Sequence, residues 1–200
     1  MNSNPTLWLA AVRGGDGIAW GRLLDHFRPY LAFLAAAQLG RRLTVKADPL
    51  DLVQETMLQA HRKFHAFRGE TGDEFAVWLE AILVSRVEKL VRRYYGTASR
   101  DLRLERELAA GIAESTRLLG TIPADPRDSP SRAASAREQA VKVATAVEKL
   151  TPEQQRVVAR HLEGLTFPQI GEQMEKSTDA VTQLWVRAIK RLRQLMEESE

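Results

Sequence analysis

The chain has 200 residues, of which 44% are apolar and none is cysteine, and its formal net charge is +3. An apolar share of this size can build one large or two small cores, which excludes a disordered chain. The missing cysteines exclude disulfide frameworks, thiolate zinc sites and cysteine nucleophiles. The first residues lack a signal-peptide pattern and no long apolar run follows, so we expect a soluble, cytoplasmic protein.

The positive charge is concentrated in three segments of the chain. Residues 1–47 carry six basic and two acidic side chains, residues 86–106 carry seven and three, and residues 176–196 carry five and one. Local basic patches indicate contact with a polyanion. The low total argues against a protein that coats nucleic acid or a membrane surface.

Helical periodicity runs through most of the first hundred residues. Apolar side chains recur every three or four positions over residues 20–34, 48–67 and 73–96, which predicts three amphipathic helices. Asp48 followed by Pro49 is a typical helix start, with an N-cap and a proline at the first helical position.

The second half of the chain begins with a break in this pattern. Glycine and proline accumulate over residues 109–131, which predicts an interdomain linker. Helix starts with a capping-box pattern follow at Thr151 and Thr166. No stretch alternates with a period of two, so the sequence predicts an all-α fold of two small helical domains, residues 1–108 and 132–200.

The end of the second domain has the pattern of a helix-turn-helix motif: a short helix after Thr166, a turn, and a longer helix after Ser177. In this motif the start of the second helix meets base edges in the major groove. Hydroxyl and amide groups suit base edges, and arginines suit phosphates. A helical hairpin with a solvated basic face fits the same pattern. The candidate DNA contacts are Ser177, Thr178, Asp179, Thr182, Gln183, Arg187, Lys190 and Arg191.

The helix expected over residues 73–96 combines a basic face with nearby aromatic residues. Such a surface suits stacking on unpaired bases together with phosphate contacts. Core packing of the aromatic side chains is the alternative. The candidates are Phe64, Phe67, Arg68, Trp78, Ser85, Arg86, Lys89, Arg92 and Arg93, with Tyr94, Tyr95 and Arg100 just beyond.

Asp51, Gln54 and Glu55 share one polar face of the helix that starts after Asp48. The face suits a basic partner surface, whereas carboxylates on a polar helix face make a poor catalytic pair. His61 and His65 are four residues apart, but no third ligand is nearby, so we expect no metal. Phosphate-binding loops, nucleophile elbows and dinucleotide fingerprints are missing, so we expect no catalytic residue, no cofactor and no enzyme.

Two blocks of sequence resemble one known family. The first resembles region 2 of bacterial RNA polymerase sigma factors of the extracytoplasmic-function subgroup, in the sigma-70 family, and its matching runs are DLVQETM at 51–57, FHAFRGE at 64–70 and AVWL at 76–79. The second resembles region 4, with LTPE at 150–153, LEGLT at 162–166, IGE at 170–172 and RAIKRL at 187–192. The two blocks stand in the family's order with a linker between them.

The resemblance implies a factor without chemistry of its own that binds core RNA polymerase, directs it to promoters and helps to open the DNA. Asp51, Gln54 and Glu55 would dock on the clamp helices of the largest polymerase subunit, and the flap of the second-largest subunit would be a further contact. The loop at residues 67–73 and the helix at residues 78–93 would meet the −10 element, and the helix after Ser177 would read the −35 element. The resemblance is also compatible with an anti-sigma protein as a partner. It gives no reason to expect binding to a membrane.

Two residues depart from the family pattern. Ser85 stands where asparagine is usual, which leaves the −10 preference open, and Glu175 stands at a turn position that is usually glycine. A free-standing helix-turn-helix regulator with an N-terminal sensing or dimerisation domain is the main alternative. A degenerate sigma-like interaction module is a weaker one. The acidic face at Asp51 and the linker favour the polymerase factor.

Overall fold

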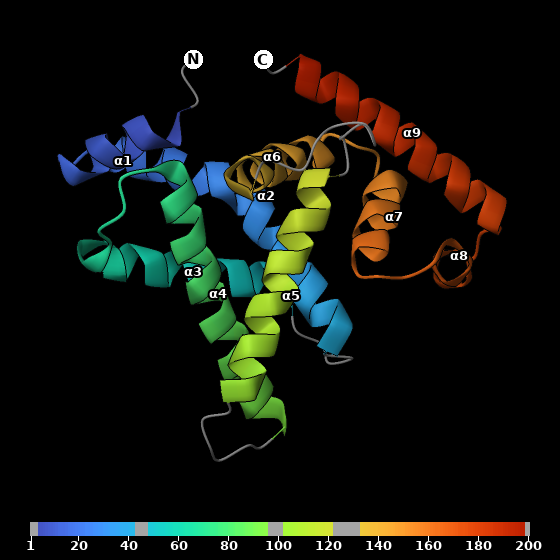
Figure 1. Ribbon diagram of the computed structural model, residues 1–200, viewed down its shortest axis with the longest axis horizontal. Helices are drawn as coiled ribbons and strands as arrows, with labels where there is room; N and C mark the ends of the chain where they lie inside the picture. Colours follow the sequence, from blue (N-terminus) through green and yellow to red (C-terminus); the bar gives the residue numbers. More distant parts are fainter. Residues whose placement is uncertain (1–3, 43–47, 96–101, 122–132, 199–200) are drawn as a thin grey trace. The chain divides into compact units, whose positions relative to one another are not determined.

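The computed structural model describes residues 4–42, 48–95, 102–121 and 133–198 (Figure 1). Within these ranges every regular element is a helix, which confirms the all-α fold class. The chain divides into two compact units, Met1–Ala113 and Glu114–Glu200, each of which is described separately below. No helix of the described ranges is long and apolar enough to cross a membrane.

The first unit is built around three packed helices, α2, α3 and α4, with the short helix α1 against α2 and α4. The 3₁₀ turn η1 links α3 to the loop before α4, and α5 starts in this unit and ends in the second. The bounds are α1 Pro5–Arg13, α2 Gly17–Arg42, α3 Pro49–Lys63, η1 Phe64–Ala66, α4 Gly72–Tyr95 and α5 Leu102–Thr121.

The core of the first unit follows the apolar stripes read from the sequence. Leu23 and Leu31 of α2 and Leu79 of α4 are completely buried, and burial of each such side chain contributes about 1.5–3 kcal/mol. Tyr30 is also buried, and its hydroxyl donates to Oε1 of Glu80 at 2.6 Å. This hydrogen bond joins α2 to α4 and satisfies the polar atom of a buried ring.

Helix α1 was not among the expected helices, although its start signal is in the sequence. The side chain of Asn4 accepts from the backbone N–H of Thr6 at 3.0 Å, and Pro5 takes the first helical position. The helix ends at Gly14, and a second glycine with φ of 91° follows. An N-cap asparagine followed by proline is therefore the signal that would have located α1.

Helix α5 corrects the predicted linker. Residues 109–121 are helical, and the remaining residues 122–131 lie outside the described part of the chain. The helix continues because Leu108, Ile112 and Leu119 bury one side of it. Gly111 weakens a free helix, but it has a packing role here, since a Cβ at this position would lie 2.9 Å from Oε1 of Gln38.

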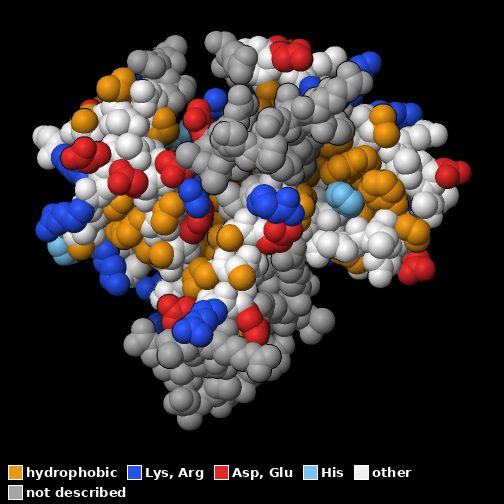
Figure 2. All heavy atoms as spheres, viewed as in Figure 1, with side chains coloured by type: hydrophobic (Ala, Val, Ile, Leu, Met, Phe, Trp, Pro, Cys, Tyr) orange, Lys and Arg blue, Asp and Glu red, His pale blue; other side chains and the backbone are white. Residues whose placement is uncertain are grey.

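The second unit contains α6 Ala133–Val147, α7 Pro152–Leu162, α8 Phe167–Met174 and α9 Thr178–Glu197. Both predicted capping boxes form, at Thr151 with Gln154 and at Thr166 with Gln169. A small core of Val157, Ile170 and Val181 joins α7, α8 and α9, and partly buried aromatic and aliphatic side chains surround it. Figure 2 shows hydrophobic side chains gathered at the surface near α7 and α9.

Candidate nucleic-acid and partner interfaces

The turn between α8 and α9 has the close packing that a helix-turn-helix motif requires. A Cβ on Gly171 would lie 2.7 Å from the carbonyl oxygen of Lys176, so only glycine fits there. The N–H of Lys176 donates to the Gly171 carbonyl at 2.9 Å. Glu175 adopts the left-handed conformation, with φ of 55° and ψ of 42°. Ser177 then caps α9 by accepting from the N–H of Ala180 at 3.2 Å.

An ion pair connects this turn to the start of α7. Nζ of Lys176 lies 2.9 Å from Oε1 of Glu153. The hydrogen bond from Lys176, and then its charge, lower the pKa of the Glu153 carboxyl below its ordinary value. The pair therefore links the turn to the helix that precedes the motif.

The outward face of α9 carries the predicted −35 contacts. Its side chains are exposed apart from Thr182, which is half-buried and donates its hydroxyl to the Thr178 carbonyl at 2.9 Å. A guanidinium nitrogen of Arg187 lies 3.4 Å from Oε1 of Gln183, one turn away. Along this face of α9, the amide and hydroxyl side chains lie nearer the N-terminal end of the helix, and the basic side chains lie nearer the C-terminal end. The exposed members are Ser177, Thr178, Asp179, Gln183, Arg187, Lys190 and Arg191.

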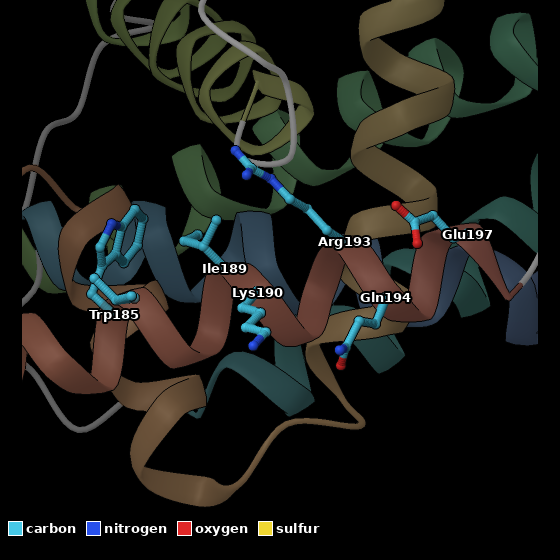
Figure 3. Close-up of a pocket in the computed structure, with 7 residues that line it drawn as sticks. Trp185, Ile189, Lys190, Arg193, Gln194 and Glu197 are labelled. Atoms are coloured by element: carbon cyan, nitrogen blue, oxygen red, sulfur yellow. The ribbon is translucent and has the colours of Figure 1, made fainter.

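A second face of α9 forms an open groove of about 500 Å³. Trp185, Ile189, Arg193 and Glu197 follow one another along one side of the helix, as Figure 3 shows. Val186 also lines the groove and is 59% exposed. The groove is apolar only at Trp185, Val186 and Ile189. Its other lining residues are charged or polar, and they are Lys190, Arg193, Gln194 and Glu197.

In the first unit, the exposed side of α4 changes from apolar to basic along the helix. Val77, Ala81, Ser85, Lys89 and Arg93 stand four residues apart, and all five are exposed. The stripe therefore brings together three of the predicted −10 residues. Small side chains at its start leave the helix backbone accessible, and the two cations near its end suit a phosphate chain.

Two of the predicted basic residues lie beside this stripe instead of on it. Arg86 and Arg92 are half-buried, and their Nε atoms find no hydrogen-bond partner within the described residues. Arg92 also forms an ion pair with Glu88 one turn earlier. Arg86 and Arg92 are therefore less available for contacts with DNA phosphates than fully exposed arginines would be. The side chains of Tyr94 and Tyr95, and all of Arg100, lie outside the described part.

The predicted aromatic contacts divide between core and surface. Phe67 is only 7% exposed, and its ring centroid lies 5.0 Å from that of Trp78 and 5.4 Å from that of Phe75. Phe64 is half-buried against Trp20, at 4.8 Å. Phe67 is therefore a core residue, whereas Phe64 and Trp78 keep part of their rings at the surface. Arg68 is exposed, and its guanidinium donates to the carbonyl of His65 at 3.2 Å.

The loop between Phe67 and α4 is organised by Glu74. Its Oε2 accepts from the N–H groups of Glu70 and Thr71 at 2.8 and 3.0 Å, and from the Thr71 hydroxyl at 3.0 Å. These backbone bonds, followed by the hydroxyl, lower the pKa of the Glu74 carboxyl. Glu74 is therefore ionised at neutral pH, which strengthens all three hydrogen bonds.

The outer face of α3 is acidic and apolar together. Asp51, Gln54 and Glu55 are exposed as predicted. Leu50 and Leu58, which the sequence analysis did not single out, are 57% and 53% exposed on the same side of the helix. The sequence does contain a signal for these two leucines, because both lie outside the apolar stripe that forms the core side of the helix. Exposed leucines among acids suit a protein partner more than they suit DNA.

The two histidines near the end of α3 have other contacts. The ring of His61 packs on Trp20, with centroids 5.4 Å apart, and Nδ1 of His65 lies 3.1 Å from the Arg62 carbonyl. No group of three potential metal ligands occurs within the described ranges.

Comparison with known proteins matches both units to one family. The model of sigma-70 region 2 matches residues 23–97, and the model of sigma-70 region 4 matches residues 146–194. The chain belongs to the sigma-70 family. Members of this family are transcription factors and not enzymes. The candidate −10 and docking residues all lie within the region 2 match, and the candidate −35 residues lie within the region 4 match.

One similar protein is the ECF RNA polymerase sigma factor BldN of Streptomyces coelicolor. It is 27% identical over 189 residues, which cover 94% of this sigma-70 family chain and 64% of the relative. The chain thus spans about 64% of the length of that curated relative. This similarity agrees with the two sigma-70 family models.

Proposed function

We propose that this sigma-70 family chain is a transcription initiation factor that binds core RNA polymerase, directs it to specific promoters and assists DNA opening. The observation that carries the proposal is the pairing of two surfaces in one chain. One is a helix-turn-helix with a polar, then basic, recognition face on α9. The other is the exposed stripe on α4 beside partly exposed aromatic rings.

Helix α9 supplies the −35 contacts in this proposal. The exposed hydroxyl and amide groups of Thr178 and Gln183 stand at the end of the helix that enters the major groove. Arg187 and Arg191 lie one and two turns further on, where the phosphate backbone runs beside the helix. The left-handed turn at Glu175 and the close approach at Gly171 set the angle between the two helices.

Helix α4 supplies the −10 contacts. Opening a duplex removes bases from the stack at a cost of a few kcal/mol, which a protein recovers by stacking and by phosphate contacts. The partly exposed rings of Phe64 and Trp78 lie near the start of the stripe, and Lys89 and Arg93 lie near its end. Arg68 is exposed in the adjoining loop. The DNA bases would then be held at the start of the α4 stripe, and the DNA backbone would be held near its end.

Two further surfaces are assigned to protein partners. The acidic and apolar face of α3, with Asp51, Gln54 and Glu55, docks on the clamp helices of the largest polymerase subunit. The groove along α9, with apolar Trp185, Val186 and Ile189 beside charged side chains, is the surface of the second unit that we assign to the flap of the second-largest subunit. An anti-sigma protein would compete for surfaces of this kind.

Reconstitution with core RNA polymerase tests the proposal. Purified protein and core enzyme are expected to form a complex that starts transcription at defined sites of a genomic template, which core enzyme alone does not. The double variant Asp51→Ala with Glu55→Ala should weaken core binding about tenfold, because two charges leave the docking face. Asp25→Ala removes an acid that is 72% exposed on α2 and serves as the matched control.

The same experiment separates the two classes of function. A protein that does not associate with core polymerase, yet binds defined duplex sites by itself, would be a free-standing regulator. Association with core polymerase without initiation would indicate a sigma-like interaction module.

A further inference from the structure

Helix α1 lies upstream of the region 2 match, yet it packs beside the loop that leads into α4 (Figure 1). This loop comprises residues 67–72 and is called the 67–72 loop below. Nothing in the proposed function uses α1. Its contacts with the 67–72 loop raise the question of what the helix does for DNA recognition.

Four contacts join α1 to the 67–72 loop. The guanidinium of Arg13 donates to the carbonyl of Gly69 and also lies over the Phe67 ring, with Cζ 5.9 Å from the ring centroid. The hydroxyl oxygen of Thr6 accepts from the N–H of Gly72 at 3.3 Å. Gly72 lies so close to the Pro5 ring that an added Cβ would be 2.8 Å from Cβ of Pro5.

The 67–72 loop needs such support because residues 67–71 form no regular secondary structure, and only its last residue, Gly72, belongs to α4. Glu74 binds the N–H groups of Glu70 and Thr71 from the α4 side. On the other side, Gly69 crosses the Phe67 ring so closely that a Cβ would come within 2.6 Å of it. The carbonyl of Gly69 is thereby presented to Arg13.

We propose that Arg13 is a positioning residue for −10 recognition, which holds the 67–72 loop in the shape that accepts an unstacked base. The proposal rests on the function proposed above, and it assigns to α1 a role outside the matched region. A loop held in its binding conformation before DNA arrives spends less binding free energy on ordering. Base discrimination at the −10 element then depends on a side chain that need not touch the base.

A direct phosphate contact by Arg13 is the competing explanation, because the side chain is exposed and a guanidinium has five N–H donors. The two explanations differ in their dependence on salt. Each neutralised phosphate of a single strand contributes about −0.7 to the slope of log affinity against log salt concentration. A positioning residue leaves this slope unchanged and alters base preference instead.

Hydrogen exchange of the free full-length protein tests the structural half of the proposal without DNA. Arg13→Gln and Thr6→Val remove independent contacts between α1 and the loop. Each is expected to speed amide exchange in peptides covering residues 67–74 by about threefold or more, while peptides from the middle of α4 stay unchanged. Arg28→Gln, which removes an exposed arginine paired with Asp25 on α2, is the matched control and should change neither region.

Binding by the reconstituted holoenzyme tests the functional half. The probe is a single-stranded DNA pool of 12 nucleotides with six randomised central positions, and bound molecules are sequenced. Arg13→Gln, Arg13→Lys and Thr6→Val should each reduce enrichment of the preferred bases about three- to tenfold with an unchanged salt slope, since lysine lacks the planar fork that both bonds Gly69 and covers Phe67. Arg28→Gln should match the wild type.

Three outcomes overturn the proposal. The first is unchanged loop exchange in Arg13→Gln. The second is base enrichment in Arg13→Gln equal to that of the wild type. The third is a reduced salt slope in Arg13→Gln together with full rescue by Arg13→Lys, which would make Arg13 a phosphate contact. If the wild-type holoenzyme enriches no bases, the function proposed above fails, whereas the exchange result still reports on Arg13 and the loop.

Discussion

Glu175 is the non-glycine residue of the described ranges that has a positive φ. It stands in the turn where glycine would relieve the crowding between Cβ and the carbonyl group, which costs roughly 1–2 kcal/mol in the left-handed region. The turn nevertheless forms because Ser177 caps α9 and Ile170 and Val181 pack across it. Tertiary packing therefore outweighs an unfavourable residue here.

We expect Glu175→Gly to raise the free energy of unfolding of the second unit by about 0.5–1 kcal/mol, because the relief of strain exceeds the entropy that glycine adds to the unfolded chain. Chemical denaturation monitored by circular dichroism measures the change. Glu172→Gly makes the same replacement at a helical position and should destabilise by about 1 kcal/mol. A loss of stability in Glu175→Gly would show that the glutamate side chain has a favourable contact in the turn.

Gly171 requires the opposite substitution test. Gly171→Ala places a methyl group 2.7 Å from the backbone oxygen of Lys176, which cannot move aside as a flexible side chain can. Overpacking of this kind costs about 1–3 kcal/mol, so thermal unfolding should occur at a lower temperature. Gly21 on α2 has open space around it, and Gly21→Ala should stabilise by about 0.5–1 kcal/mol. Equal effects of the two variants would contradict the close approach.

Among the elements, α7 and the turn are connected by the ion pair of Glu153 and Lys176. The pKa of Glu153 is lowered in the folded protein by the hydrogen bond from Lys176, so the pair stabilises the fold above the carboxyl's ordinary value of 4.5. That contribution disappears as the pH falls through the lowered folded value.

Lys176→Met should therefore reduce the pH dependence of stability between about pH 5 and pH 3, with the wild type losing more on acidification. Unfolding midpoints in urea across this pH range give the comparison. Lys190→Met, on the outward face of α9, removes a lysine that is not paired with Glu153 and should follow the wild-type curve. Parallel curves for the wild type and Lys176→Met would rule out a contribution from this pair.

Along α9, base contacts and phosphate contacts are expected at different positions. Arg187→Ala should weaken binding of the holoenzyme to all promoter sequences and reduce the salt slope by about 0.9, the contribution of one duplex phosphate. Gln183→Ala should leave the slope unchanged and alter preference at one base position. Fluorescence anisotropy on a panel of single-substitution duplexes separates the two effects. If neither variant differs from the wild type, α9 is not the recognition helix.

For the whole molecule, the small net charge of +3 limits affinity for DNA. Within the described ranges, several basic side chains are paired or half-buried, as Arg92 is. Few phosphates can then be neutralised by the protein alone, so binding at physiological salt should be weak without a partner.

We expect the free protein to bind promoter duplexes with dissociation constants of about 10⁻⁴–10⁻⁶ M and little sequence preference, and core polymerase to make binding specific. Electrophoretic mobility shifts with and without core enzyme measure both states. Tight and specific binding by the protein alone would instead support the free-standing regulator.

Sequence periodicity and capping signals were sufficient for most helices and for the turn before Ser177, because these depend on neighbouring residues. They also placed Asp51, Gln54 and Glu55 on an exposed face. Local signals were misread at the predicted linker, where Gly111 packs against Gln38 inside a helix. The conformational preference of a glycine is the same whether it ends a helix or makes room inside a helix for a neighbouring side chain, so the sequence alone does not separate the two cases.

The sequence by itself determined the helical class, the two family regions and the basic face of α9. Only the tertiary structure decided which aromatic and basic side chains remain available. In the folded chain Phe67 is buried, Trp78 is partly exposed and Arg92 forms an ion pair with Glu88. The tertiary structure also brought Arg13 to the loop at Gly69, 56 residues away in the chain. Such contacts arise from packing between helices distant in sequence, which no local pattern encodes.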